Sequence, residues 1–179
     1  IQLLLSLLQI IDNPEQDLPM AAVLHSGLVG LDANELGALR LTGEGSLWSL
    51  MPMYAEQAQD ERLVQFLGHI ERWRTLSRRH GVADLLWDIY ETLDYVNYVG
   101  AMPNGLVRRA NVMALYERAK GFESSGFRGL FRFLRFVESL RDSNQDMAVA
   151  NVVTEADDVV RLMTIHKSKG LEFPVVFLS

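Results

Sequence analysis

The final segment of the chain, residues 157–179, constrains the fold more than any other stretch. Two apolar runs rich in β-branched residues, 159–165 and 175–178, flank a polar turn that begins at His166. This pattern predicts a strand, a loop and a buried strand. Strands that are apolar on both faces are typical of covered, usually parallel sheets. Because ligands bind at the carboxyl ends of such strands, we expect a binding site in this turn.

The turn carries side chains that suit a phosphate-rich ligand. Thr164 and His166 share one face of the strand, because side chains repeat every two residues. Together with Lys167, they present a hydroxyl, an imidazole and an ammonium group, which can bind the oxygens of a nucleic-acid backbone. Gly170 permits a tight loop. The alternative is that these side chains only finish a strand, and that Lys167 and Glu172 only solvate a turn.

The pairing of the two terminal runs stays open on spacing alone. The loop at residues 166–173 is shorter than the usual crossover between parallel strands. A hairpin and a parallel pair are therefore both compatible with the pattern.

The remainder of the chain predicts helices and no convincing strand, so the fold class is mainly α with a short β stub at the end. Helical spacing and helix-stop signals predict an irregular assembly of helices. We expect helices at residues 2–11, 18–25 with Asp17 as cap, 32–41 opened by an Asp32–Glu35 capping box, from Ser46 to before Pro52, 56–80, 85–93, 106–122 and 127–141. Residues 142–156 lack a clear period and predict a linker to a second domain.

Several large apolar side chains are expected in the helical core. Trp73 and Trp87 stand at helical spacing, where aromatic residues usually pack. The last helix is expected to bury one apolar face, formed by Phe127, Leu130, Phe131, Leu134 and Val137.

The same last helix carries a possible contact for nucleic acid. Arg128, Arg132 and Arg135 are spaced i, i+4 and i+7, which predicts one helical face. Such a stripe, together with Arg108 and Arg109, can rest on the phosphate backbone of duplex DNA. The net charge of −6 argues against attraction of the whole chain to a polyanion, but residues 106–141 hold eight basic residues against three acidic ones. The alternative is a solvated face.

Composition excludes several kinds of protein. The absence of cysteine excludes a disulfide scaffold and a thiolate metal site, and fits the reducing cytoplasm. No apolar run is long enough for a membrane span, and no leading basic region marks a secretion signal. No metal site is expected, because the histidines are scattered without ligand spacing: His25, His69, His80 and His166.

The chain also lacks the usual parts of an ATPase or nuclease site. It has no phosphate loop, no acidic pair for magnesium of the Walker B kind and no carboxylate cluster that suggests a nuclease. We therefore expect no catalytic residue in this chain, and no tight binding of ATP or Mg²⁺ to it alone. Both ends interrupt an apolar pattern, which predicts that the chain is part of a longer polypeptide.

A resemblance to known proteins adds to these expectations. Residues 161–177, RLMTIHKSKGLEFPVVF, resemble motif V of superfamily-one DNA helicases of the UvrD/RecB kind. The match is long and has few free positions. The preceding residues are similar to the AddA (RexA) family of bacterial helicase/nuclease subunits, most clearly at residues 11–14, 21–24, 30–32 and 125–136.

This resemblance implies a domain division and roles for the turn residues. Residues 1–150 would form a 2B-type helical insertion domain, and residues 151–179 a linker and the start of the second RecA-like motor domain, with parallel strands. Thr164, His166 and Lys167 would lie beside single-stranded DNA. Glu172 would face the nucleotide, where it can accept from a ribose hydroxyl, and Gly170 would join the two contacts.

The resemblance further implies an enzyme larger than this chain. Such an enzyme uses ATP and Mg²⁺ to unwind DNA from double-strand ends for recombinational repair, carries a nuclease domain elsewhere and pairs with an AddB (RexB) subunit. Two other classes remain as alternatives: a non-catalytic helical DNA-binding module, whose affinity falls with salt, and a protein-docking or structural spacer, whose binding does not.

Overall fold

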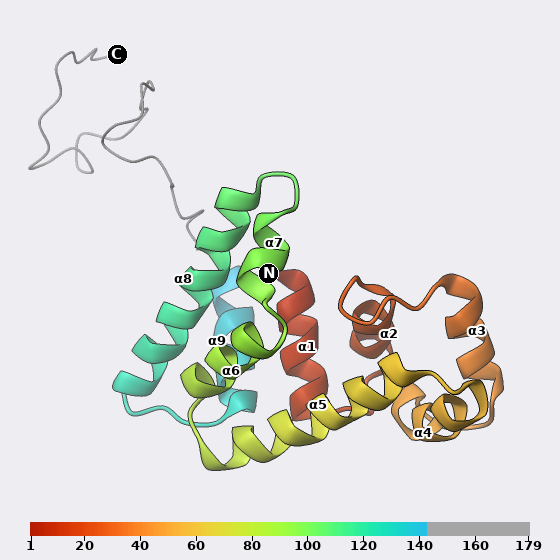
Figure 1. The fold of residues 1–179 in the computed structure, drawn as a ribbon. Coiled ribbons are helices and arrows are strands. Elements are labelled where there is room, and N and C mark those ends of the chain that lie inside the picture. The colour runs from red at the N-terminus through yellow and green to blue at the C-terminus, as the bar shows by residue number, and fades with distance from the viewer. Residues whose placement is uncertain (143–179) are drawn as a thin grey trace, which may run out of the picture.

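The computed structural model describes residues 1–142, which form nine α-helices and no strand within that range (Figure 1). The expected mainly α fold is confirmed for this part of the chain. The linker at 142–156, apart from its first residue, and the two terminal apolar runs lie outside the described residues.

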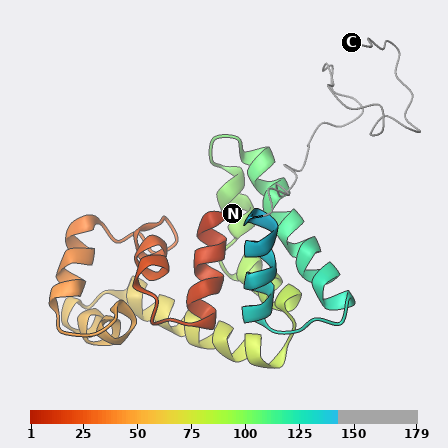
Figure 2. The ribbon, with the colours of Figure 1, turned by 180° about the vertical axis from the view of Figure 1, so that it is seen from behind.

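The helices form two groups that are joined by two long-range braces. The first group contains α2 (Asp17–His25), α3 (Ala33–Leu41) and α4 (Leu47–Ala58). The second group contains α6 (Val82–Thr92), α7 (Tyr95–Gly100), α8 (Gly105–Ser124) and α9 (Leu130–Asp142). The braces are α1 (Gln2–Asp12), which contacts α2, α5 and α9, and α5 (Glu61–Arg79), which contacts α4 and α6. Figures 1 and 2 show α5 running along one edge beneath both groups, with α1 between them.

Helix α1 is buried on almost every side because it packs against both groups. Leu4, Leu7, Leu8 and Ile10 have no accessible surface. A helix that is apolar all round is the kind that a core surrounds. The prediction of a buried helix that stops before Pro14 is confirmed.

Two of the three predicted caps are confirmed. The carboxylate of Asp32 accepts from the Glu35 amide at 2.8 Å, and the Glu35 carboxylate accepts from the Asp32 amide at 2.7 Å. Ser46 Oγ accepts from the Ser49 amide at 3.2 Å. Asp17 was predicted as the cap of α2, and this is wrong. Its carboxylate accepts from the Leu47 amide at 2.8 Å and so joins α2 to the start of α4.

The boundary between α4 and α5 differs from the prediction. Helix α4 was expected to end before Pro52, but it continues to Ala58 because Met51 and Ala55, on either side of the proline, are buried. The helix expected at 56–80 is interrupted. Gln59 adopts φ 50°, and Asp60 then caps α5 by accepting from the Arg62 amide at 3.0 Å.

The two tryptophans have different environments. Trp73 is 1% exposed, and its Nε1 donates to Asp88 Oδ2 at 2.9 Å, which ties α5 to α6. The prediction for Trp87 is wrong, since its side chain is 45% exposed and lies beside the Tyr116 ring on α8. Helix α6 buries Leu85 and Ile89, and the helical period turns Trp87 away from that face.

Candidate nucleic-acid interface

The candidate interface is the corner where α8 ends, residues 125–129 turn and α9 begins. Gly126 and Gly129 adopt φ +83° and +93°, a left-handed conformation that side chains disfavour. Helix α9 starts only at Leu130, and the Phe133 amide donates to the Gly129 carbonyl at 3.1 Å. The prediction that this helix starts at Phe127 is therefore wrong, because Gly129 breaks the helical conformation.

The three predicted arginines lie on this corner but not on one helical stripe. Arg128 is exposed in the turn, and Arg132 and Arg135 are exposed on α9. Arg135 Nη1 lies 3.5 Å from Glu138 Oε2, an exposed pair of small energetic weight. Among the side chains of residues 1–141, Arg128 and Arg132 have no ion-pair partner. We name the exposed surface formed by Phe127, Arg128, Phe131, Arg132 and Arg135 the α8–α9 corner.

The buried face of α9 differs from the predicted one. Leu130, Phe133 and Val137 are buried, whereas Phe127 and Phe131 are 54% and 62% exposed. Each residue of a helix turns by about 100°, so Phe131 points away from the face that Leu130 and Phe133 share. Phe127 precedes the helix and does not follow its period. The surface therefore presents aromatic rings between its arginines.

A cluster of phenylalanines holds the corner in place. Phe122, at the end of α8, stacks on Phe127 with centroids 5.3 Å apart and an interplanar angle of 22°. Phe133 meets Phe122 edge-on at 5.5 Å, and Phe136 lies at the same distance. Aromatic pairs in these geometries add stability beyond the area they bury. The turn is thus anchored to both helices.

The carboxylates of α8 have partners other than the arginines of the corner. Glu117 Oε1 accepts from Lys120 at 3.3 Å. The Glu123 carboxylate accepts from the Val82 amide at the start of α6, close to Gly81. This contact also sets the α5–α6 turn against the end of α8, where the corner begins.

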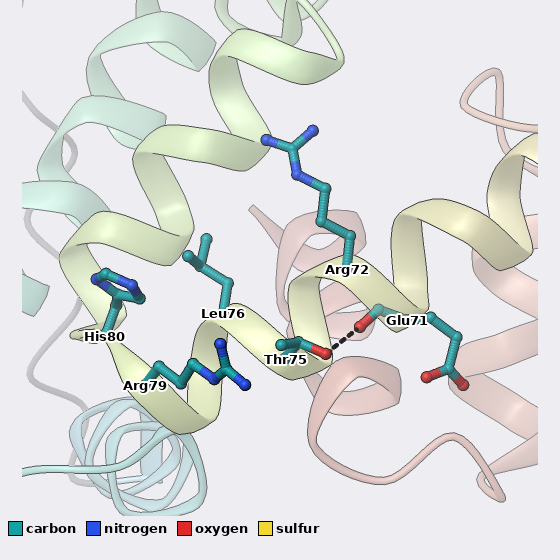
Figure 3. Close-up of a pocket in the computed structure, with 6 residues that line it drawn as sticks. All are labelled: Glu71, Arg72, Thr75, Leu76, Arg79 and His80. Carbon is teal, nitrogen blue, oxygen red and sulfur yellow. Dashed lines mark hydrogen bonds between the residues drawn. The ribbon is translucent and has the colours of Figure 1, made fainter.

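A surface groove at the end of α5, next to the α5–α6 turn, contains two further arginines, Arg72 and Arg79 (Figure 3). The groove has a volume of about 440 Å³ and is lined by Glu71, Arg72, Thr75, Leu76, Arg79 and His80. Figure 3 shows Arg72, Leu76 and His80 projecting from the same side of the helix. The Arg72 guanidinium is bound to the Asp88 carboxylate, whereas the Arg79 side chain is exposed. The groove was not predicted, although the dense basic residues at 72–79 are a signal for it in the sequence.

The other predicted site residues cannot be placed. Thr164, His166, Lys167, Gly170 and Glu172 lie outside the described residues. Within residues 1–142, no group of His, Asp and Glu side chains is arranged to hold a metal ion. In the same range, no helix is both long and apolar enough to cross a membrane.

Comparison with known families and proteins gives a consistent picture. Residues 50–179 match the UvrD-like helicase C-terminal domain family. The chain is also similar to bacterial proteins named as the A-type subunit of an ATP-dependent helicase/nuclease. It is 47% identical to the one from Anoxybacillus flavithermus over 100% of the chain, 50% identical to the one from Bacillus licheniformis over 98%, and 49% identical to the one from Desulforudis audaxviator over 100%.

These relatives are much longer than this chain, which spans 15% of the length of each. The family match includes the residues that resemble motif V. It confirms the resemblance to UvrD/RecB helicases, and the named relatives confirm the resemblance to the AddA family. The chain therefore belongs to the UvrD-like helicase C-terminal domain family.

Proposed function

We propose that this chain is a section of an ATP-dependent DNA helicase/nuclease subunit that processes double-strand ends for recombinational repair. In this proposal, residues 1–150 form a helical insertion domain of the 2B type. Residues 151–179 form the linker and the start of the second motor domain. Support comes from the family match and from relatives whose name states helicase and nuclease activity.

The motif V residues would connect nucleotide state to the grip on DNA. Thr164, His166 and Lys167 would contact single-stranded DNA, and Glu172 would accept from the nucleotide's ribose hydroxyl on the other side of Gly170. ATP and Mg²⁺ would be held mainly by residues that this chain does not contain. A partner subunit of the AddB (RexB) kind would complete the enzyme, which we expect to act in the cytoplasm.

The α8–α9 corner would supply a second contact to DNA within the helical domain. The observation that carries this part of the proposal is the pair of exposed arginines, Arg128 and Arg132, that have no ion-pair partner among the side chains of residues 1–141. A cation without a partner can neutralise a phosphate and release its counterion. Arg78 and Arg79 are exposed at the end of α5, just before the α5–α6 turn that the Glu123–Val82 contact joins to the end of α8, and would extend the basic surface.

The test is a salt titration of DNA binding by the full chain and by the double variant R128Q/R132Q. Each neutralised phosphate contributes about 0.9 to the slope of log affinity against log salt for duplex DNA, so the variant should lose a slope of roughly 1.8. The control R40Q/K120Q removes the same charge from exposed positions on α3 and α8. Its slope should equal that of the parent chain.

The same titration separates the alternative functions. If the chain is a non-catalytic DNA-binding module, R128Q/R132Q lowers the salt slope of DNA binding. The same substitutions in the longer protein would then leave DNA unwinding unchanged. If the slopes of R128Q/R132Q and the control agree, the corner does not contact DNA. Partner binding that persists at high salt, without any DNA binding, would support a docking spacer instead.

A further inference from the structure

We infer that Phe127 is a stacking platform for an unpaired base of single-stranded DNA, with the adjoining phosphates on Arg128 and Arg132. This inference rests on the proposed function, which brings DNA to the α8–α9 corner. It goes further by naming the form of DNA that the corner binds and the side chain that selects it.

The position of the Phe127 ring carries the inference. One face of the ring is covered by Phe122, which is only 6% exposed and stacks on it at 5.3 Å. Phe127 is nevertheless 54% exposed. Because Phe122 covers one face, a ligand can reach the ring only from the opposite face or the ring edges. A flat ligand on that face would continue the stack that Phe122 begins.

The platform is held in place before any ligand arrives. Phe122 also packs against Phe133 and Phe136, so the ring behind Phe127 is fixed from two sides. Gly126 and Gly129 bracket the turn in conformations that set the direction of residues 127 and 128. A side chain that is already ordered loses little freedom on binding, which favours affinity.

The chemistry of the corner favours an unpaired polyanionic strand over a duplex. A phenyl ring has no polar atom with which to read a base edge, but it stacks on the face of any base. In a duplex those faces are covered by neighbouring base pairs. A single strand can present a base to Phe127 while its backbone reaches Arg128 in the next position.

Charge also distinguishes DNA from a protein partner at this surface. The exposed rings Phe127 and Phe131 alternate with arginines, and Arg132 and Arg128 have no acidic partner in the described part of the chain. By helical spacing, Phe131 and Arg135 lie on one face of α9, a turn apart. The arrangement therefore repeats an aromatic ring beside a cation, as surfaces that bind single strands do.

The test measures binding of the full chain to a single-stranded oligonucleotide that carries one 2-aminopurine, and to a duplex of the same length. F127L keeps apolar bulk against Phe122 but removes the flat ring. It should weaken single-strand affinity roughly tenfold, with an unchanged salt slope and a change in duplex affinity below about twofold. F127W should restore single-strand affinity and quench the 2-aminopurine fluorescence. The control W87L removes an exposed ring from α6 and should change neither affinity.

The outcomes separate this inference from the proposed function. If F127L binds single strands as the parent chain does, while R128Q/R132Q lowers the salt slope, the platform is disproved and the DNA contact stands. Equal weakening of single-strand and duplex binding by F127L would also overturn the inference. So would loss of binding in F127L and F127W together with a lowered melting temperature, because the ring would then be structural. If neither F127L nor R128Q/R132Q alters DNA binding, the proposed contact fails as well.

Discussion

Two buried tyrosines show how single side chains make the stability of this domain depend on pH. Tyr90 Oη donates to the Val112 carbonyl at 2.8 Å and joins α6 to α8. Burial raises the pKa of Tyr90 well above its usual value. Burial also raises the pKa of Tyr95 to about 12, with a further increase from Tyr98 and a smaller opposing effect from Arg108. Both phenols are therefore held neutral in the folded protein.

We predict that this domain loses stability in alkali. Above about pH 10 the phenols of the unfolded chain ionise, while those of the folded chain keep their protons. The folded state then binds more protons, so the free energy of unfolding falls as pH rises from about 10 towards the raised pKa of Tyr95, about 12. Urea denaturation at several pH values measures this decline. It should be shallower in Y95F, and equal slopes in Y95F and the parent chain would contradict the prediction.

At the residue scale, the sequence predicts contacts that are local and misses those that are tertiary. The Asp32–Glu35 capping box and the Ser46 cap were predictable, because both partners lie within three residues. Asp17 has its partner thirty residues away at Leu47, so no local pattern could indicate it. The exposure of Phe131 depends on where α9 starts, which Gly129 determines through its backbone conformation.

At the element scale, the α7–α8 turn depends on a close approach of two glycines. A Cβ at Gly105, the first residue of α8, would overlap the carbonyl group of Gly100, at the end of α7. Backbone atoms cannot move aside as the end of a side chain can. In contrast, a Cβ at Gly68, within α5, would meet nothing within 4 Å.

We predict opposite effects for alanine at these two glycines. G105A should lower the free energy of unfolding by about 1–3 kcal/mol, because the turn must shift to accept the methyl group. G68A should raise it by up to about 1 kcal/mol, since alanine favours a helix interior more than glycine does. Urea denaturation midpoints measure both changes, and G68A serves as the matched control. Equal midpoints for the two variants would show that the α7–α8 turn accepts a methyl group at residue 105 without strain, which would contradict the prediction.

The helices themselves were largely predictable, but their boundaries were not. Apolar periodicity located α5 and α6, because each buries one face, whereas the leucine and isoleucine content located α1, which is buried almost all round. The turns before Leu106 and after Phe122 located α8. The short helix α7 was missed because only Tyr95 and Val99 are buried in it. Pro52 misled the prediction, since packing of Met51 and Ala55 outweighs the hydrogen bond that a proline cannot donate. The predicted arginine stripe was also affected by a helix boundary. Arg132 and Arg135 lie on α9, whereas Arg128 precedes the helix.

At the scale of the whole molecule, the two helix groups are held together by braces that the sequence does not reveal. The sequence identifies α1 and α5 as helices, but not that each contacts both groups. Asp88 reinforces this arrangement by accepting from Trp73 and from Thr92, and by pairing with Arg72. The second group is therefore fixed on α5, and with it the position of the α8–α9 corner.

Charge distribution at this scale is compatible with DNA binding by an acidic chain. The net charge is −6, yet on α8 and α9 Glu117 pairs with Lys120 and Glu138 with Arg135, while the charged carboxylate of Glu123 accepts from the Val82 amide. Only the arrangement in space shows which cations remain without a partner. The motif V residues were identified from their sequence pattern, and their roles stay predictions.

The most direct test of the account is DNA unwinding by the longer helicase/nuclease protein that would contain this chain. E172Q should weaken nucleotide use and H166A should weaken the grip on single-stranded DNA, each lowering the unwinding rate roughly tenfold through a lost hydrogen bond to a charged or polar ligand group. The control S168A changes the same turn and should unwind at the parental rate. If E172Q and H166A also unwind at the parental rate, the proposal that this chain belongs to a nucleotide-driven DNA motor is contradicted.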